Sequence, residues 1–237
     1  MTPRELSERD SLRTAEKRKL TLLRADLLCW AADHGRHFPW RNRDAKTYQQ
    51  IVVEVLLQRT TAAAVARFYN DFFERFASWE DLAVASTEDL EHFLKPLGLW
   101  RRRAVSLLGL AKYAAARGGN FPGDSALHRS IPAVGQYVSN AIVMFQHGEA
   151  TPLLDVNMAR VIERFVRPRR LADIRHDPWL QQAAHWIVRG ASPEQVNWAV
   201  LDFAALICKA RKPACPNCPV RERCNYLKAR RKEKPIR

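Results

Sequence analysis

The sequence predicts an all-α protein, and three observations support this fold class. Apolar residues recur mainly at helical spacing, convincing runs that alternate apolar and polar residues are absent, and the boundaries of the expected helices carry capping residues. A length of 237 residues and a hydrophobic fraction of 47% are ample for a buried core. We therefore expect a folded, globular, helical protein.

The expected helices follow one another along the chain with short joints between them. The apolar positions of a first amphipathic helix are Leu20, Leu23, Ala25, Leu28 and Ala31/Ala32. Residues 51–57 are apolar except for Glu54 and suit a buried helix. Further helices are expected at 62–76, 87–94, 101–117, 137–146, 156–165, 178–189 and 193–207.

The positive charge is concentrated at the end of the chain. The net charge is +14 at pH 7, and the segment from Lys209 to Arg237 holds eleven lysines or arginines against two acids. Such a segment attracts phosphates by releasing their counterions, which favours nucleic acid as a partner. A solvated, disordered tail after Tyr226 is the alternative explanation for part of this charge.

Neither a membrane span nor an export signal is expected. The sequence has no run of about 18 uncharged apolar residues, and its first 24 residues mix both signs of charge with polar side chains. We expect a cytoplasmic, nucleoid-associated protein without membrane contact.

Four of the five cysteines form a cluster with the spacing Cys208-x6-Cys215-x2-Cys218-x5-Cys224. Three prolines between them exclude a continuous helix, so residues 208–224 are expected to form a loop around a metal centre. Disulfides are disfavoured in a cytosolic chain with clustered cysteines, but a structural zinc ion is a real alternative. The spacing suits the wider [4Fe–4S] centre better. Cys29 stands apart, and we expect it in the core.

Two further segments carry chemistry. The segment Ile131-Pro-Ala-Val-Gly-Gln-Tyr137 suits a hairpin between two helices, in which Gly135 frees the backbone for a tight turn and the amides that follow can face a phosphate. Asp155 directly precedes the expected helix 156–165. Taken alone, such an acid is most often a helix N-cap.

Together these patterns resemble the helix-hairpin-helix DNA glycosylase superfamily, which includes endonuclease III, the MutY adenine glycosylases and the Mig-type thymine mismatch glycosylases. The similarity runs from about Phe38 to Tyr226 and includes the cysteine spacing. Ala133 departs from the glycine that the family has in its hairpin. The resemblance is greatest to the Mig-type enzymes, because of three candidate catalytic residues, Asp155, Glu54 and Tyr137.

The resemblance implies two helical lobes. The first, residues 45–150, is a barrel-like domain that ends in the helix-hairpin-helix motif. The second combines residues 1–44 with 151–237 and contains the cluster loop, residues 208–224, and a basic tail. By the same resemblance, Cys208, Cys215, Cys218 and Cys224 hold a [4Fe–4S] cluster.

The resemblance also implies roles for Asp155, Glu54 and Tyr137. An ionised Asp155 would stabilise the positive charge that develops on the sugar when an N-glycosidic bond breaks. Glu54, at a position where MutY-type and Mig-type enzymes carry a glutamate, would act as a general acid or assist water; exposure to solvent or pairing with Arg59 is the alternative. Tyr137 stands where endonuclease III has its Schiff-base lysine, so strand cleavage lacks its nucleophile. A buried structural tyrosine is the alternative there.

Side chains that enter or grip DNA are expected in three loops. To reach the sugar, the enzyme must flip the target nucleotide out of the helix, and the gap is filled by a wedge. The expected DNA-contacting residues are Gln58, Arg59, Leu99, Trp100, Arg101, Val134, Gly135 and Gln136, with Arg102 and Arg103 as further phosphate contacts. A core pair of Leu99 and Trp100 beside a basic, solvated turn is the alternative. Asn197 and Asp202 are expected to serve helix packing and hydrogen bonding.

The resulting hypothesis is a monofunctional DNA glycosylase that excises thymine or uracil mispaired with guanine in base excision repair. We expect it to act as a monomer on double-stranded DNA that carries a mismatched or damaged base. Two alternatives stay open. One is a MutY-like adenine glycosylase without its C-terminal 8-oxoguanine-reading domain, and the other is a non-catalytic iron–sulfur DNA-binding protein.

Overall fold

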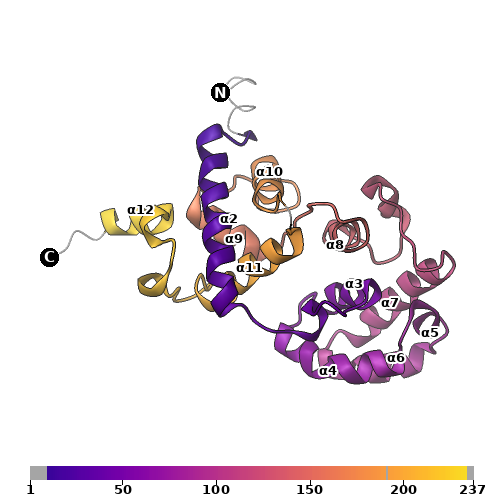
Figure 1. The fold of residues 1–237 in the computed structure, drawn as a ribbon. Coiled ribbons are helices and arrows are strands. Elements are labelled where there is room, and N and C mark those ends of the chain that lie inside the picture. The colour runs from indigo at the N-terminus through magenta and orange to yellow at the C-terminus, as the bar shows by residue number, and fades with distance from the viewer. Residues whose placement is uncertain (1–9, 191, 234–237) are drawn as a thin grey trace. The chain divides into compact units, whose positions relative to one another are not determined.

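The computed structural model describes residues 10–190 and 192–233 and is built from helices (Figure 1). Within these residues no strand occurs, which confirms the all-α fold class. The longer helices are α2 (Thr14–His34), α3 (Thr47–Leu56), α4 (Ala62–Arg75), α6 (Thr87–Leu94), α7 (Trp100–Ala115), α8 (Gln136–His147), α9 (Val156–Phe165), α10 (Pro178–Ile187), α11 (Pro193–Leu206) and α12 (Asn225–Glu233). The shorter ones are α5 (Trp79–Ala83) and the 3₁₀ segments η1 (Pro39–Arg41), η2 (Lys95–Leu97), η3 (Ser125–Ser130), η4 (Cys215–Asn217) and η5 (Arg221–Arg223).

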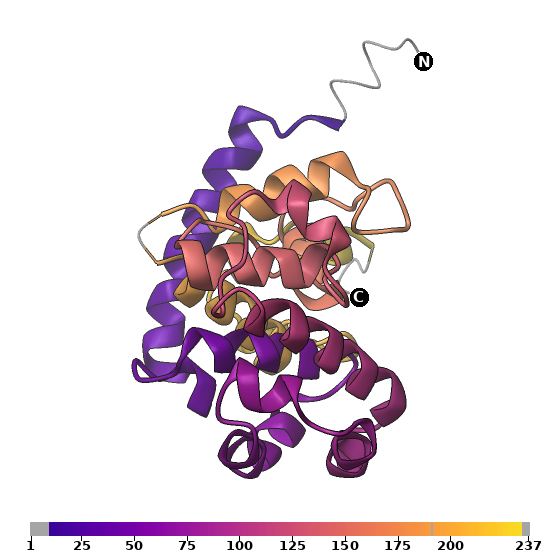
Figure 2. The same ribbon diagram turned by 90° about the vertical axis from the view of Figure 1, so that its right-hand side faces the viewer.

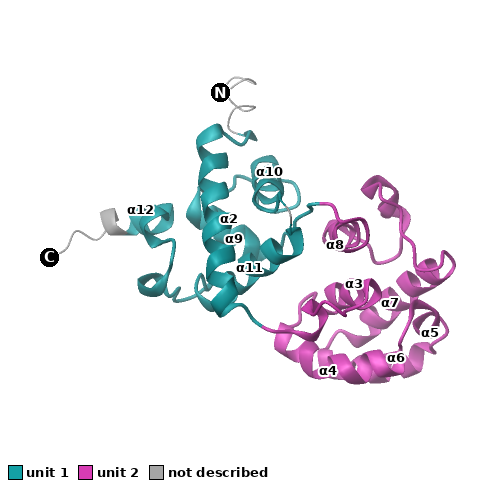
Figure 3. Ribbon diagram, viewed as in Figure 1, with its two compact units in different colours: residues 1–36, 150–237 teal, residues 37–149 magenta. Residues whose placement is uncertain are grey.

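The chain divides into two compact units, coloured separately in Figure 3. One unit is His37–Glu149, and the other joins Met1–Arg36 to Ala150–Arg237. The boundaries expected from the sequence lie between residues 44 and 45 and between residues 150 and 151. Each unit has a hydrophobic core of its own.

The unit His37–Glu149 is organised around α3. This helix packs against α4, α7 and α8, and α7 in turn packs against α5 and α6 (Figures 1 and 2). All its residues from Ile51 to Leu56 are buried, as the apolar segment predicts. A polar side chain in the segment from Ile51 to Leu56 is therefore buried away from water.

The second unit is organised around α2, which packs against α10 and α11, while α9 packs against α10, α11 and α12. The buried stripe of α2 consists of Leu20, Leu23, Leu27 and Trp30 together with Glu16. Two expectations were wrong here, because Ala25 and Cys29 are exposed. The buried face of α2 runs through Leu20, Leu23, Leu27 and Trp30, and Ala25 and Cys29 lie on the other side of the helix.

The nine expected helices are all present, with boundaries that shift by a few residues. Among the α-helices of the described residues, two were not expected. The short α5 has too few residues for a periodic signal, and α12 lies in the basic segment, part of which a disordered tail could have explained. None of the described helices combines the length and the apolar character that a membrane span requires.

Candidate functional site

Glu54 lies buried at the centre of its unit, with 2% of its surface exposed. The exposed-glutamate alternative is therefore excluded. A buried carboxyl group requires hydrogen-bond partners because burial removes its water. The hydroxyl of Tyr137 donates a hydrogen bond to Oε2 of Glu54, at 2.6 Å.

This contact joins two of the residues that the sequence singles out, although they are 83 positions apart. It forms because α8 packs against α3, and because Tyr137 lies in the first turn of α8. Tyr137 is half-buried, so its ring extends from the partly exposed start of α8 to the buried carboxyl group. The pair forms a polar unit inside an apolar core.

The hairpin before α8 has a left-handed residue at Ala133, where φ is 64°. Gly135 instead has φ −87° and ψ 179°, an extended conformation open to any residue, and it occupies the N-cap of α8. The expectation that Gly135 supplies the conformational freedom of the turn was therefore wrong. The residue in the conformation that favours glycine is Ala133, the position at which the sequence departs from the family pattern.

The start of α8 has the features of an anion site. Gly135 and Gln136 are exposed, Val134 is partly exposed, and α8 has no side-chain cap. Backbone amides at a helix start and the positive end of the helix dipole both favour a phosphate.

Asp155 is the N-cap of α9. Its Oδ1 accepts hydrogen bonds from the backbone amides of Asn157 at 2.9 Å and Met158 at 2.8 Å, and its Oδ2 accepts one from the side chain of Asn157. The capping role is thus present in the structure. It also fixes the carboxylate at the helix mouth, where the helix dipole stabilises its negative charge.

Two residues behind Asp155 were not anticipated from the sequence. Arg160 donates to the side-chain oxygen of Asn157 at 3.1 Å, and also to the backbone oxygens of Cys208 at 2.8 Å and Ala204 at 3.1 Å. A chain of hydrogen bonds therefore runs from Asp155 to the first cysteine of the cluster. The only sequence signal was their spacing, since residues two and five positions after an N-cap lie within the first turns of the helix.

Asn197 and Asp202 have the packing roles expected of them. The side chain of Asn197 accepts from the amide of Leu153 at 2.7 Å and donates to the carbonyl of Thr151 at 3.1 Å, which anchors the segment that leads to Asp155. Asp202 is buried and pairs with Arg36, whose Nε lies 2.7 Å from Oδ1.

The candidate wedge residues differ in exposure. Gln58 and Arg59 are exposed, and Leu99 keeps 52% of its surface exposed. Trp100 is partly buried against the core, with the guanidinium of Arg101 4.1 Å from the centre of its ring. Of the two neighbours Leu99 and Trp100, Leu99 is therefore the more exposed.

Arg103 does not fit the expected role of a phosphate contact. It is 5% exposed and its guanidinium group donates to oxygens of its own unit. The expectation was wrong because Arg103 lies on the inner side of α7, whereas Arg101 and Arg102 are exposed.

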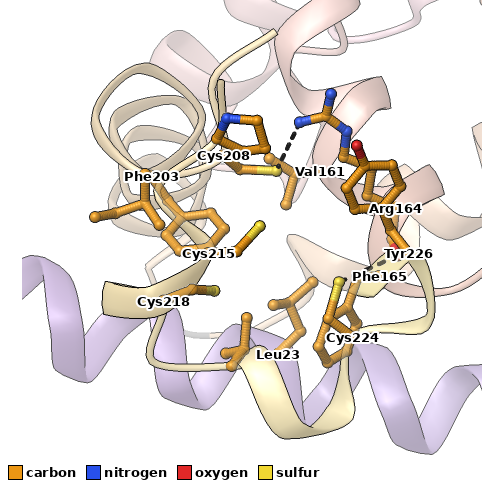
Figure 4. A pocket seen from close by; sticks show the side chains of 13 residues that line it. Leu23, Val161, Arg164, Phe165, Phe203, Cys208, Cys215, Cys218, Cys224 and Tyr226 are labelled. Carbon is orange, nitrogen blue, oxygen red and sulfur yellow. Dashed lines mark hydrogen bonds between the residues drawn. The ribbon is translucent and has the colours of Figure 1, made fainter. Parts of the chain in front are cut away.

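The four cysteines of the cluster line one pocket, together with apolar side chains (Figure 4). Its empty volume is about 390 Å³, and the apolar lining residues are Leu23, Val161, Phe165, Phe203, Ile207, Pro213 and Val220. In Figure 4 the sulfur atoms surround the open centre of this pocket. Burial raises the pKa of the Cys208 thiol, and raises that of the Cys218 thiol to about 11.

Four thiols around one pocket are the donor set that a [4Fe–4S] cluster takes, and a structural zinc ion takes the same set. Within residues 10–190 and 192–233, no three His, Cys, Asp or Glu side chains are grouped closely enough to hold one metal ion. Arg164 donates to the sulfur of Cys208 at 3.6 Å and to the carbonyl of Lys209 at 2.7 Å, so a positive charge faces the pocket.

The model of the HhH-GPD superfamily of base excision DNA repair proteins matches residues 52–174. This chain belongs to that superfamily. The matched region of this HhH-GPD protein contains Glu54, Tyr137 and Asp155 together with the hairpin.

Known relatives cover most of this HhH-GPD protein. The thymine-DNA glycosylase of Aeropyrum pernix is 35% identical over 89% of this chain and 96% of its own length. The thymine/uracil-DNA glycosylase of Methanothermobacter thermautotrophicus is 32% identical over 90% of this chain and 96% of its own. The human adenine DNA glycosylase is 31% identical over 87% of this chain, which spans only 39% of that protein.

A solved structure has the same fold. The structure of a thermostable thymine-DNA glycosylase aligns with a TM-score of 0.78 and 29% identity, covering 90% of this chain and 98% of its own.

Proposed function

We propose that this HhH-GPD protein is a monofunctional DNA glycosylase that removes thymine or uracil mispaired with guanine. The observation that carries the proposal is the hydrogen bond between Tyr137 and Glu54. It occupies the two positions at which the resemblance separates Mig-type enzymes from endonuclease III. The thymine- and uracil-acting relatives, matched along nearly their full length, support the choice of base.

In the proposed reaction, the C1′–N1 bond of the flipped nucleotide breaks with its electron pair on the base. Asp155, fixed by its capping bonds, stabilises the positive charge on the sugar. The base takes up a proton and water adds its oxygen to C1′, with Glu54 assisting the transfer and Tyr137 orienting Glu54. A phenol in place of a lysine amine forms no imine with the sugar, so the DNA backbone stays intact.

A panel of duplexes tests this function. Single-turnover incubations would use T·G, U·G, A·G, A·8-oxoguanine and 5-methylcytosine·G, each analysed with and without alkali. We expect T·G and U·G strands to break only after alkali, because alkali cleaves the abasic product. Reaction of the adenine duplexes alone would favour the MutY-like alternative, and binding without any reaction would favour the non-catalytic one.

A pair of matched variants tests the role of Asp155. Asp155→Asn keeps an N-cap of similar quality but removes the negative charge, so we expect the rate to fall on the order of 10²–10³-fold. Asp124→Asn makes the same change at the N-cap of η3, where Asp124 accepts from Ala126, and should leave the rate unchanged. Full activity of Asp155→Asn contradicts the mechanism.

We also propose that Cys208, Cys215, Cys218 and Cys224 hold a [4Fe–4S] cluster. The four thiolates would hold the loop 208–224 around the cluster, and Arg164 of α9 donates hydrogen bonds to the Cys208 sulfur and the Lys209 carbonyl of this segment. The cluster takes no part in breaking the glycosidic bond. Iron and acid-labile sulfide in the anaerobically purified protein are expected, and Cys218→Ser should lower both. Stoichiometric zinc without iron contradicts the assignment.

The proposed enzyme acts as a monomer on double-stranded DNA. Light scattering coupled to gel filtration, with and without a T·G duplex, would test this, since a second protein chain adds 27.3 kDa to the measured mass.

A further inference from the structure

Three loops of the unit His37–Glu149 share an unusual backbone feature. In the described part of the chain, four non-glycine residues have positive φ, and three of them, Arg59, Leu99 and Ala133, lie in these loops at 58°, 51° and 64°. All three residues line a single polar hollow that is open to solvent. Left-handed conformations of non-glycine residues cost on the order of 1 kcal/mol each and persist only where surrounding contacts hold them.

One side chain, Arg103, donates hydrogen bonds to two of these loops. Its Nη2 donates to the carbonyl of Gln58 at 2.6 Å, and its Nε donates to the carbonyl of Gly98 at 2.9 Å. These carbonyls belong to the residues immediately before Arg59 and Leu99. Nη2 also bonds the hydroxyl of Thr60.

Arg103 also caps the end of α3. Its Nη1 donates to the carbonyl of Leu56 at 2.7 Å and lies 3.4 Å from that of Val55. The last carbonyls of a helix lack partners within the helix and carry the negative end of its dipole, so a cation is favoured there. The helix that carries Glu54 therefore ends on the same guanidinium group that holds both loops.

The cost of burying this charge indicates that it has a specific task. Burial lowers the pKa of the Arg103 guanidinium. Its described partners are carbonyl and hydroxyl oxygens, with no carboxylate among them. Such a group is stable only when its donors are satisfied in a fixed geometry, which the planar fork of arginine provides and the single ammonium of lysine does not.

We propose that Arg103 is a positioning residue that presents Arg59 and Leu99 to DNA by locking their loops in left-handed conformations. The inference rests on the proposed function, in which these two residues enter or grip the duplex. In this role Arg103 does not itself touch DNA. It acts through the carbonyls of Gln58 and Gly98 and holds the loops in place before DNA binds.

A double-mutant cycle tests this role. Leu99→Ala, Arg103→Lys and the double variant would be compared with the native protein in single-turnover cleavage of a T·G duplex. We expect Leu99→Ala to slow the native enzyme roughly tenfold but the Arg103→Lys enzyme less than about threefold, because a wedge on a loose loop contributes little. The control is Arg117→Lys, the same change at an exposed arginine of the same unit. It should alter neither the rate of the native enzyme nor that of Leu99→Ala. Losses that multiply independently overturn the proposal, since a merely destabilising change at Arg103 would leave the effect of Leu99 intact.

Limited trypsin digestion provides a readout without DNA. Trypsin cuts after Arg59, and we expect Arg103→Lys to accelerate this cut several-fold while Arg117→Lys does not. Thr60→Val removes one acceptor of Arg103 and should accelerate cleavage after Arg59 to a smaller extent. This variant replaces Arg103→Lys in the test if Arg103→Lys fails to fold. Unchanged cleavage at Arg59 in both variants contradicts the proposal. A native protein that processes no duplex contradicts the proposed function, whereas an active native protein with independent losses contradicts only the role of Arg103.

Discussion

The polar pair Tyr137 and Glu54 lies where the apolar character of α3 would favour two hydrophobic side chains. Glu54 is buried and accepts the Tyr137 hydroxyl at 2.6 Å, so each satisfies a hydrogen-bonding group of the other. Removing one partner leaves the other without this bond in an environment where water cannot replace it. The two residues should therefore behave as a unit in stability and in activity.

Double substitution at this pair gives the first prediction. Glu54→Gln should lower the single-turnover rate on a T·G duplex by about 10²–10⁴-fold, because it removes a group that transfers protons. Tyr137→Phe should lower it by roughly tenfold through loss of orientation alone. In the double variant the loss should be close to that of Glu54→Gln alone.

The control for this prediction is Tyr113→Phe, the same change at a half-buried tyrosine that stacks on Phe121. It should leave the rate unchanged. A double variant whose loss equals the product of the two single losses would show that Tyr137 acts independently of Glu54.

Glu16 gives a prediction about pH. Burial by itself would raise the pKa of this carboxyl group, but hydrogen bonds from Arg13 and Arg167 outweigh it and lower the pKa to about 2. The folded state therefore binds the proton less readily than the unfolded state, so this group stabilises the fold above an unfolded pKa of 4.5. The stabilisation should be lost progressively as pH falls from about 4.5 toward 2.

Urea unfolding of the native protein and of Glu16→Gln across this range would check the prediction. The amide oxygen of the variant can still accept the indole N–H that Trp179 donates to Glu16, but its NH2 group replaces the oxygen that accepts from Arg13 and Arg167, so the variant loses both the charge and these bonds. We expect the variant to be less stable at pH 7, on the order of 3 kcal/mol at most, and the difference to shrink below about pH 4.5. A difference that stays constant down to pH 3 contradicts the assignment.

At the scale of elements, the hairpin before α8 combines a strained turn with close packing. Ala133 has φ 64°, a conformation that costs an alanine on the order of 1 kcal/mol. Pro132, next to it, packs on α7, where a Cβ at Gly109 would lie 2.8 Å from the Pro132 Cβ. Gly109 thus permits the hairpin to approach α7, and this packing helps to hold the turn.

Ala133→Gly should therefore stabilise the protein. Relief of the left-handed strain is expected to exceed the entropy that glycine adds to the unfolded chain, for a net gain of about 0.5 kcal/mol in the free energy of unfolding. Ala116→Gly is the control, because Ala116 is exposed and has φ −61°. Ala116→Gly adds the same conformational entropy to the unfolded chain without relieving any backbone strain, so it should lower the free energy of unfolding. A loss of stability in both variants would show that Ala133 is not strained.

At the scale of the whole molecule, charge controls the encounter with DNA. The net charge is +14, and Lys209, Arg211 and Lys212 are exposed beside the cluster pocket. Each phosphate contact releases counterions, so affinity for an undamaged duplex should fall steeply as salt rises, roughly 10³-fold between 50 and 200 mM if about six contacts form.

Neutralising these three residues to glutamine should reduce the slope of log affinity against log salt by up to about 2.7, which is roughly 0.9 for each contact. Fluorescence anisotropy over a salt series would measure it. The same substitution of three exposed arginines elsewhere, Arg67, Arg75 and Arg117, removes equal charge and should change the slope much less. Equal reductions in the two triple variants would show that only net charge matters.

The sequence by itself determined the helical fold class, the family and the residues worth testing. Periodicity reports which face of a helix is buried, and cysteine or hairpin motifs are local in the chain, so both are readable without coordinates. For this reason a buried helix could be predicted at residues 51–57, which the structure places at Thr47–Leu56, and the burial of Glu54 could be favoured over its exposure.

Only the tertiary structure decided which of these residues act together. The partner of Glu54 lies 83 positions away, and it is found only once α8 packs on α3. Arg103 looks like its neighbours Arg101 and Arg102 in the sequence, yet helix rotation places it inside, and Cys29 is turned outward for the same reason. Contacts between distant residues and the orientation of a helix about its axis are set by packing as a whole, which local sequence patterns do not specify.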